Sequence, residues 1–163
     1  MFCQKNITIF FHFLDNIAKI LPLQFSINVL NLIYMENLDK DYYLTSASVL
    51  AFVGDSVYSV IIRSALAEKH DFLAGKLNRL ANLYVCAKAQ ARTLDRITPA
   101  LTEREHDIVM RARNISPNNV PKSCTIAEYT MATALEALFG YLYLTKQYDR
   151  MNELITIGIG EIE

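Results

Sequence analysis

An all-α fold is what this sequence predicts, and three observations lead to it. After residue 44, apolar residues recur at helical spacings along most of the chain. After residue 35, no segment alternates apolar and polar residues over the length of a strand. Two Thr-x-x-Glu capping boxes mark helix starts. The chain has 163 residues, no internal repeat and few glycines or prolines, so we expect one compact domain.

The first helix is expected over residues 48–66, SVLAFVGDSVYSVIIRSAL, where apolar residues follow the helical period. The Thr-Ser pair at 45–46 supplies an N-cap. A turn follows over residues 70–75, which contain His, Asp and Gly. A second helix is predicted over residues 76–97, because Pro99 prevents its continuation.

A capping box formed by Thr102 and Glu105 begins a third helix, which is expected to run toward Arg113. The residues that follow, 115–123, contain two prolines and an Asn-Asn pair and show no periodicity. We therefore predict a loop there.

The second capping box, Thr125 with Glu128, begins a fourth helix that continues to about residue 145. Asp149 is predicted to cap a final helix across residues 151–157, MNELITI. Nothing in this part of the chain indicates a second domain.

Residues 1–34 differ from the rest of the chain. They carry only three charged side chains, and residues 21–29 alternate in a way that interrupts any transmembrane run. They show no convincing signal-peptide layout. We expect residues 1–34 to be an extension outside the main domain of residues 35–163; one explanation is translation from a start codon upstream of Met35. A natively expressed protein whose intact mass begins at Met1 would contradict that explanation.

Cysteine usage favours a reducing cytoplasm. The three cysteines, Cys3, Cys86 and Cys124, are odd in number and far apart, and no CxxC or Cys/His cluster occurs. A disulfide framework or a structural zinc site is therefore not expected.

The net charge of −1 hides a basic segment. Residues 76–122 contain nine Lys and Arg against four Asp and Glu, and the remainder of the chain is acidic. Such a segment suits a face that binds a polyanion. The alternative is a set of solvated helix faces.

Two acids stand within apolar helical sequence: Asp55 in AFVGDSVYSV and Glu136 in MATALEALFGYLYL. Neither has a Lys or Arg three or four residues away, so a buried carboxylate there needs a partner from elsewhere. The partner is a core Arg, the other carboxylate through a shared proton, or a bound cation. Gly54 and Gly140 would let two helices approach closely. One interpretation is therefore tight helix packing around a buried salt bridge.

A cation partner would be a hard metal ion. Two oxygen donors without Cys or His suit Mg²⁺ or, as a substitute, Mn²⁺, which keep several waters and bind substrate phosphate. Such an ion promotes phosphodiester hydrolysis without a nucleophilic side chain. The sequence shows no Ser/His/Asp or Cys/His constellation that would supply one.

These motifs resemble those of the ribonuclease III family. VLAFVGDSVYSVIIR is similar to its signature helix, whose Gly-Asp step supplies a catalytic metal ligand, and TALEALFGYLYL is similar to its second acidic helix. VCAKAQA, the RARN sequence before the loop, and AEYTMATALEAL resemble the short bacterial form, Mini-ribonuclease III. The resemblance covers about residues 44–154.

The resemblance implies a homodimeric ribonuclease III-type endonuclease domain that cuts both strands of double-stranded RNA and leaves 5′-phosphates and 3′-hydroxyls. It assigns Asp55 and Glu136 as catalytic residues and metal ligands. The expected substrate is a large-subunit ribosomal RNA precursor, with a ribosomal protein as an assisting partner. The double-stranded-RNA-binding domain of larger relatives is not expected here.

The chain departs from the larger enzymes at three positions. Ser48, Ala51 and Thr133 stand where those enzymes carry additional acids, as in the short form, which leaves fewer protein ligands for each ion. The loop 115–120 departs further, because relatives often carry Lys and Gly where this chain has Ser and Asn. Asn78 stands where relatives often place His.

RNA recognition by shape requires side chains that contact phosphates and 2′-hydroxyls. The candidates are basic or amide residues of the middle segment: Lys88, Gln90, Arg111, Arg113, Asn114 and Lys122. Two alternatives stay open. Lys88 and Gln90 could belong to an exposed helix face, and the Arg-Asn pair at 113–114 could cap helix carbonyls.

Three functions are therefore weighed: a Mg²⁺-dependent endoribonuclease, a non-catalytic RNA-binding module of the same fold, and a helical adaptor whose acids form structural salt bridges. The intact pair of Asp55 and Glu136 favours the enzyme. The adaptor gives no account of the basic segment and the matched motifs.

Overall fold

The computed structural model describes residues 40–117 and 119–162. Within this part of the chain there are six α-helices, two short 3₁₀ helices and no strand, which confirms the all-α prediction. The elements are η1 (Tyr42–Leu44), α3 (Ala47–Lys69), α4 (Ala74–Val85), α5 (Ala87–Ile97), η2 (Thr98–Ala100), α6 (Glu103–Arg113), α7 (Ile126–Leu144) and α8 (Tyr148–Ile159). The extension proposed for residues 1–34 lies outside the described residues and stays a prediction.

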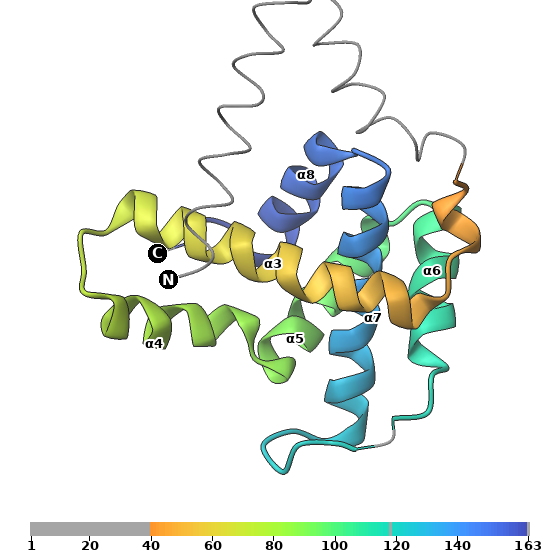
Figure 1. Cartoon of the computed structure of the whole chain (residues 1–163), viewed down its shortest axis with the longest axis horizontal. Helices are drawn as coiled ribbons and strands as arrows, with labels where there is room; N and C mark the ends of the chain where they lie inside the picture. Colours follow the sequence, from red (N-terminus) through yellow and green to blue (C-terminus); the bar gives the residue numbers. More distant parts are fainter. Residues whose placement is uncertain (1–39, 118, 163) are drawn as a thin grey trace, which may run out of the picture. The chain divides into compact units, whose positions relative to one another are not determined.

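Helices α3 and α7 cross at the centre of the fold, and α5, α6 and α8 pack around α7 (Figure 1). Two glycines make the crossing possible. A Cβ added to Gly54 would overlap the backbone carbonyl oxygen of Glu136, and one added to Gly140 would overlap that of Leu50. The close helix approach predicted from these glycines is confirmed.

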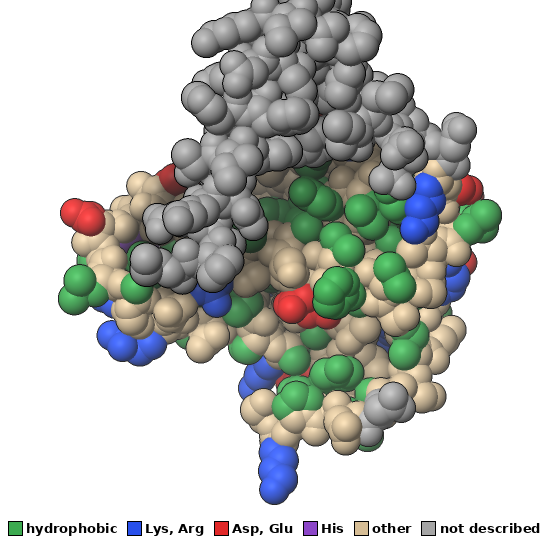
Figure 2. All heavy atoms as spheres, in the orientation of Figure 1, with side chains coloured by type: hydrophobic (Ala, Val, Ile, Leu, Met, Phe, Trp, Pro, Cys, Tyr) green, Lys and Arg blue, Asp and Glu red, His purple; other side chains and the backbone are tan. Residues whose placement is uncertain are grey.

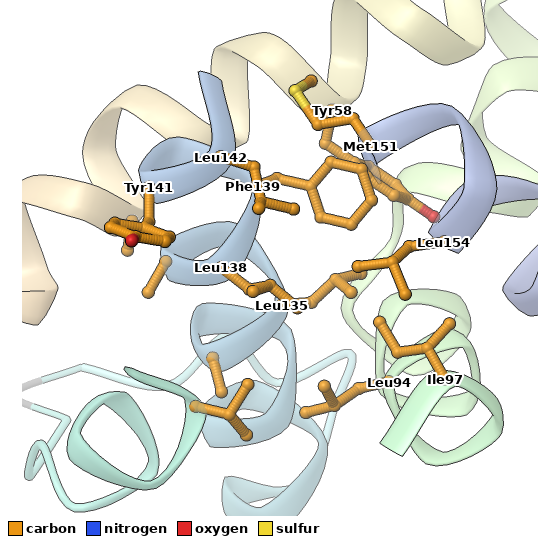
Figure 3. Packing of buried hydrophobic residues seen from close by; sticks show 14 of the residues in the cluster. Tyr58, Leu94, Ile97, Leu135, Leu138, Phe139, Tyr141, Leu142, Met151 and Leu154 are labelled. Atoms are coloured by element: carbon orange, nitrogen blue, oxygen red, sulfur yellow. The ribbon is translucent and has the colours of Figure 1, made fainter. Parts of the chain in front are cut away.

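The hydrophobic core lies between the crossing helices and α5 and α8 (Figure 3). Tyr58 of α3 meets Phe139 of α7 edge to face, with ring centroids 5.2 Å apart. Leu138 is fully buried beside them, and Leu154 brings α8 into the same cluster. Complete burial of several large side chains stabilises the fold by roughly 1.5–3 kcal/mol each, so the crossing has a rigid support.

The helix predicted over residues 76–97 is in fact two helices. The chain breaks at Cys86, whose backbone is extended (φ −71°, ψ 151°), and α4 and α5 run on either side of it. Packing explains the break: α4 buries only Ala81, whereas α5 buries an entire face that includes Gln90 and Leu94. The prediction of one continuous helix was therefore wrong. The sequence gives no warning of the break, because no Gly or Pro stands at this position.

Both predicted capping boxes are present, at the starts of α6 and α7. The prediction for the last helix was wrong by a small shift, because α8 begins at Tyr148 and its N-cap is Gln147. Asp149 therefore lies in the first turn, where a negative charge favours the helix dipole. Ser46 precedes α3 as expected, but its side chain makes no capping hydrogen bond.

Besides capping α6, Glu105 forms an ion pair with α8. Its side chain is almost fully buried and accepts hydrogen bonds from Arg150 of α8, with both N–O distances at 2.9 Å. Arg150 also donates to the backbone carbonyl of Ala100. This ion pair joins α8 to the start of α6.

Among the described residues, α3 is the one helix long and apolar enough to span a membrane by length and composition, with a mean hydropathy of 1.5 over its most apolar window. Central helices of soluble domains satisfy the same test, so the finding is weak. The packing of α3 against α7 and α4 buries part of this apolar surface, whereas Phe52 and Val60 stay exposed.

Candidate active site

A cleft of about 830 Å³ opens beside the α3–α7 crossing. Asp55 of α3 and Glu136 of α7 both line it, together with residues of α5 and of the segment between α6 and α7. Figure 2 shows acidic side chains near the middle of one face, among hydrophobic side chains. The fold therefore brings together the two acids that were singled out in distant parts of the sequence.

The two acids differ in their exposure. Asp55 is exposed to the cleft and Glu136 is partly buried. The physical reason is the helical period. Gly54 makes the contact with α7, so the next residue, about 100° further round the helix, faces the cleft instead.

Neither acid has a basic partner among the residues that the structure describes. Among residues 40–117 and 119–162, no Lys or Arg forms an ion pair with Asp55 or Glu136, and no Lys, Arg or His lines the cleft. The interpretation of a buried salt bridge at this position is therefore wrong. Burial, and after it the negative charge of Asp55, raises the pKa of Glu136 to about 7.

Gln90 of α5 completes the polar part of the cleft. It is 2% exposed, and a hydrogen bond from its side chain works against the rise in the pKa of Glu136. The alternative that Gln90 belongs to an exposed helix face is wrong. Sequence reasoning missed its contact with Glu136; the one signal was its place between two alanines, Ala89 and Ala91, on a helix that also carries apolar residues.

The donor set fits a hard divalent cation. Two carboxylates of like charge in one cleft, without a basic neighbour in the described part of the chain, are stabilised by a positive ion between them. No cluster of three or more His, Cys, Asp or Glu occurs among the described residues, so an ion would keep water or phosphate ligands, as Mg²⁺ does.

The positions at which larger ribonuclease III enzymes carry further acids also face this cleft. Ser48, Ala51 and Thr133 all line it. The hydroxyl of Thr133 donates to the backbone carbonyl of Tyr129 at 3.1 Å, inside its own helix. Asp55 and Glu136 are therefore the only acids lining the cleft in the part of the chain that the structure describes.

The remaining RNA-binding candidates lie outside the cleft lining. Four of them are exposed: Lys88, Arg113, Asn114 and Lys122. Asn114 is the C-cap residue of α6, but its contact with the helix is made by its backbone N–H, which leaves the side chain available. Their role in binding RNA stays a prediction.

Arg111 is held differently from the other candidates. Its guanidinium forms an ion pair with Asp107 at 3.0 Å and donates to the backbone carbonyl of Tyr43 at 2.8 Å. The same group lies over the Tyr43 ring. Arg111 thus anchors η1 to α6, and a contact with RNA would have to use what remains of its exposed edge.

The segment between α6 and α7 forms one wall of the cleft. Ser116, Pro117 and Asn119 line it, and no regular helix or strand occurs over the described residues of 115–123, as predicted. Sequence differences in this loop therefore change the surface next to the two acids directly.

The helical fold and the paired carboxylates at its crossing define a ribonuclease III domain, and the family model of that domain matches residues 48–147. Two relatives identify the subfamily. The chain is 40% identical over 134 residues to Mini-ribonuclease 3 of a Thermoanaerobacter species, covering 80% of this chain and 94% of the relative. It is 43% identical over 114 residues to Mini-ribonuclease 3 of Symbiobacterium thermophilum, covering 70% and 88%. This chain belongs to the Mini-ribonuclease III family.

A solved structure agrees with this assignment. The crystal structure of a Fusobacterium nucleatum protein superposes with a TM-score of 0.67 at 35% sequence identity, covering 73% of this chain and 95% of that protein. The chain is thus an endoribonuclease of the ribonuclease III type, which acts on double-stranded RNA. Enzymes of this family generally depend on divalent metal ions.

Proposed function

We propose that this protein is a Mg²⁺-dependent endoribonuclease that cleaves phosphodiesters on both strands of an RNA duplex, with Asp55 and Glu136 as its catalytic metal ligands. The observation that carries the proposal is the meeting of these two acids in one cleft without a basic partner in the described residues. Mn²⁺ is expected to substitute for Mg²⁺, because it accepts the same oxygen ligands.

A bound ion would supply an activated water and neutralise charge on the attacked phosphate. Asp55, exposed to the cleft, would bind it from α3, and Glu136 would bind it from α7. Products with 5′-phosphate and 3′-hydroxyl ends follow when water attacks phosphorus and the 3′-oxygen leaves. Because Glu136 has a raised pKa, an ion must compete with a proton for this carboxylate near neutral pH.

Binding of the duplex is proposed to use exposed basic and amide side chains around the cleft. Lys88, Arg113, Asn114 and Lys122 are exposed on three different segments, which suits recognition of the shape of an A-form helix. The basic balance of residues 76–122 supports this. Gln90 and Arg111 are less available, because both have partners within the protein.

Cleavage of both strands requires two sites, and we propose that a homodimer supplies them. An apolar groove of about 540 Å³ runs along α3 beside α7 and α8. Phe52, 80% exposed, Val60 and Tyr148 lie along it with large apolar surfaces open to solvent. Exposed apolar surface of this extent supports a protein interface there.

The biological substrate is proposed to be a precursor of large-subunit ribosomal RNA, with assistance from a ribosomal protein, in the cytoplasm. The family resemblance supports the substrate and the partner. The cysteine usage supports a reducing compartment.

The test is cleavage of a long RNA duplex by the purified full chain, in Mg²⁺ and then in EDTA. Asp55→Asn is the informative variant, and Asp95→Asn is its control, because Asp95 is exposed on α5 away from the cleft lining. We expect wild type and Asp95→Asn to cleave only with Mg²⁺, and Asp55→Asn not to cleave. Cleavage that survives EDTA or Asp55→Asn would contradict the mechanism. Binding without cleavage by wild type would identify a non-catalytic RNA-binding module.

A further inference from the structure

The burial of Gln90 calls for an explanation. Gln90 is 2% exposed, on the face of α5 that packs against α7, and it also lines the cleft beside Glu136. A buried amide without hydrogen-bond partners costs about 1–3 kcal/mol. A leucine or methionine would fill the same space without that cost, so the amide itself has a use.

Its partner indicates what that use is. The Gln90 side chain and the Glu136 carboxylate line the same cleft, and Gln90 acts to lower the pKa of Glu136. An ionised carboxylate is only an acceptor, so the Gln90 NH₂ group must be the donor. An amide fixed by packing in α5 can therefore restrict how the Glu136 carboxylate of α7 is oriented toward the cleft.

We propose that Gln90 is a positioning residue that fixes the orientation of the Glu136 carboxylate for metal binding. The inference rests on the proposed function of that site and assigns Gln90 a role distinct from RNA binding. Partners that orient metal ligands typically contribute about 10–100-fold in metal affinity or activity. Only two acids line the cleft among the described residues, so the orientation of each one should contribute a larger share of the metal affinity.

An RNA contact explains the same residue less well. The Gln90 side chain is 2% exposed and offers almost no surface to a phosphate or a 2′-hydroxyl. Lys88, two residues earlier on the same helix, is exposed. The Gln90 amide instead acts on Glu136, where it works to lower the pKa of that carboxylate.

The experiment compares wild type, Gln90→Met and Thr93→Val as full-length proteins. Gln90→Met removes the amide and keeps the volume. Thr93→Val is the matched control, because Thr93 is also a buried polar residue of α5 but its hydroxyl donates to the backbone carbonyl of Ala89 and it does not line the cleft. Mn²⁺ affinity is measured calorimetrically without RNA, and duplex affinity is measured in EDTA.

We expect Gln90→Met to bind Mn²⁺ about 10-fold more weakly than wild type, and Thr93→Val to stay within about twofold. Duplex affinity in EDTA should be unchanged in both. Cleavage by Gln90→Met should be slow at limiting Mn²⁺ and recover toward the wild-type rate as Mn²⁺ approaches saturation, which damage to the fold would not produce.

Two results would overturn the inference: wild-type Mn²⁺ affinity in Gln90→Met, or a loss of duplex affinity in EDTA without any loss of Mn²⁺ affinity. If Gln90→Met fails to fold, Gln90→Asn keeps an amide on a side chain one carbon shorter, which withdraws it from Glu136, and the same Mn²⁺ defect is expected. The Mn²⁺ measurement needs no RNA and therefore tests the role of Gln90 by itself. A wild-type protein that binds Mn²⁺ but cleaves no duplex would refute the proposed function, and the Mn²⁺ affinities of the variants would still decide the role of Gln90.

Discussion

Two glutamates in this protein lie in partly or fully buried places and have opposite surroundings. At the α6–α8 contact, burial acts to raise the pKa of Glu105, but hydrogen bonds from Arg150 and Thr102 together outweigh it and hold the pKa below its usual value. At the α3–α7 crossing, burial and Asp55 raise the pKa of Glu136 to about 7, and Gln90 opposes this only in part. Partners within the protein neutralise the first glutamate, and the second is the one that we propose binds an ion.

The sharpest test of this comparison replaces each glutamate by glutamine. Glu136→Gln should lower the rate of duplex cleavage at saturating Mg²⁺ by roughly 1000-fold, because several kcal/mol of charge stabilisation depend on the ion. Glu105→Gln should leave the rate within about twofold of wild type at a temperature where it is folded, because Glu105 is remote from the cleft lining. Equal losses in both variants, measured as initial rates, would contradict the division of roles.

The next largest effect concerns the glycines that set the crossing. Gly54→Ala should destabilise the protein by about 3 kcal/mol in urea unfolding, because the new methyl group would overlap the backbone of Glu136. Gly75→Ala is the control, since its nearest neighbour is an Arg79 side-chain atom 4.0 Å away. It should stay within about 1 kcal/mol of wild type or gain stability. An equally small effect at Gly54 would show that the helices separate easily.

Removal of the partner of Glu105 should have a smaller effect, and on stability alone. Arg150→Met should cost about 2 kcal/mol, because it leaves a buried carboxylate without its charged donor. Arg79→Met, at an exposed position of α4, should cost less than about 0.5 kcal/mol. Urea unfolding measures both. A loss of cleavage in folded Arg150→Met would mean that the α6–α8 contact also serves the active site.

The smallest predicted effect is the pH dependence of the metal-free protein. Folding raises the pKa of Glu136 from 4.5 to about 7, so the folded state binds this proton more tightly than the unfolded state. In EDTA, the contribution of Glu136 to stability is therefore full below about pH 4.5 and is lost as the pH rises through 7. After allowance for partial exposure, the loss should be on the order of 1 kcal/mol.

Glu136→Gln should remove this part of the pH dependence, since glutamine does not titrate. Urea unfolding in EDTA at pH 5 and pH 8 compares the two proteins. A wild-type protein whose stability falls no more than that of the variant between these values would contradict the raised pKa.

Local sequence signals predicted the fold well where the interactions are local. Both capping boxes form as expected, because each depends on residues only three positions apart. The break at Cys86 was not predicted, because no residue there disfavours a helix and the cause is the packing of α5 against α7.

The site was predicted in part. The choice of Asp55 and Glu136 came from their apolar neighbours and the family resemblance, and both line the cleft. The apolar neighbours of Asp55 in the sequence did not indicate that it is exposed, because the rotation of a helix about its axis is decided by its tertiary contacts. The partner of Gln90 could not be predicted, since nothing in the sequence places α5 beside that part of α7.

The reciprocal contact of Gly54 and Gly140 has a mechanical consequence. When one helix rocks on another, its ends travel furthest and the point of contact hardly moves. Asp55 follows Gly54 directly, and Glu136 supplies the carbonyl oxygen against which Gly54 rests. Both acids therefore lie next to the point at which α3 and α7 touch. A tilt of α3 on α7 about this contact would therefore leave the spacing of these two carboxylates almost unchanged.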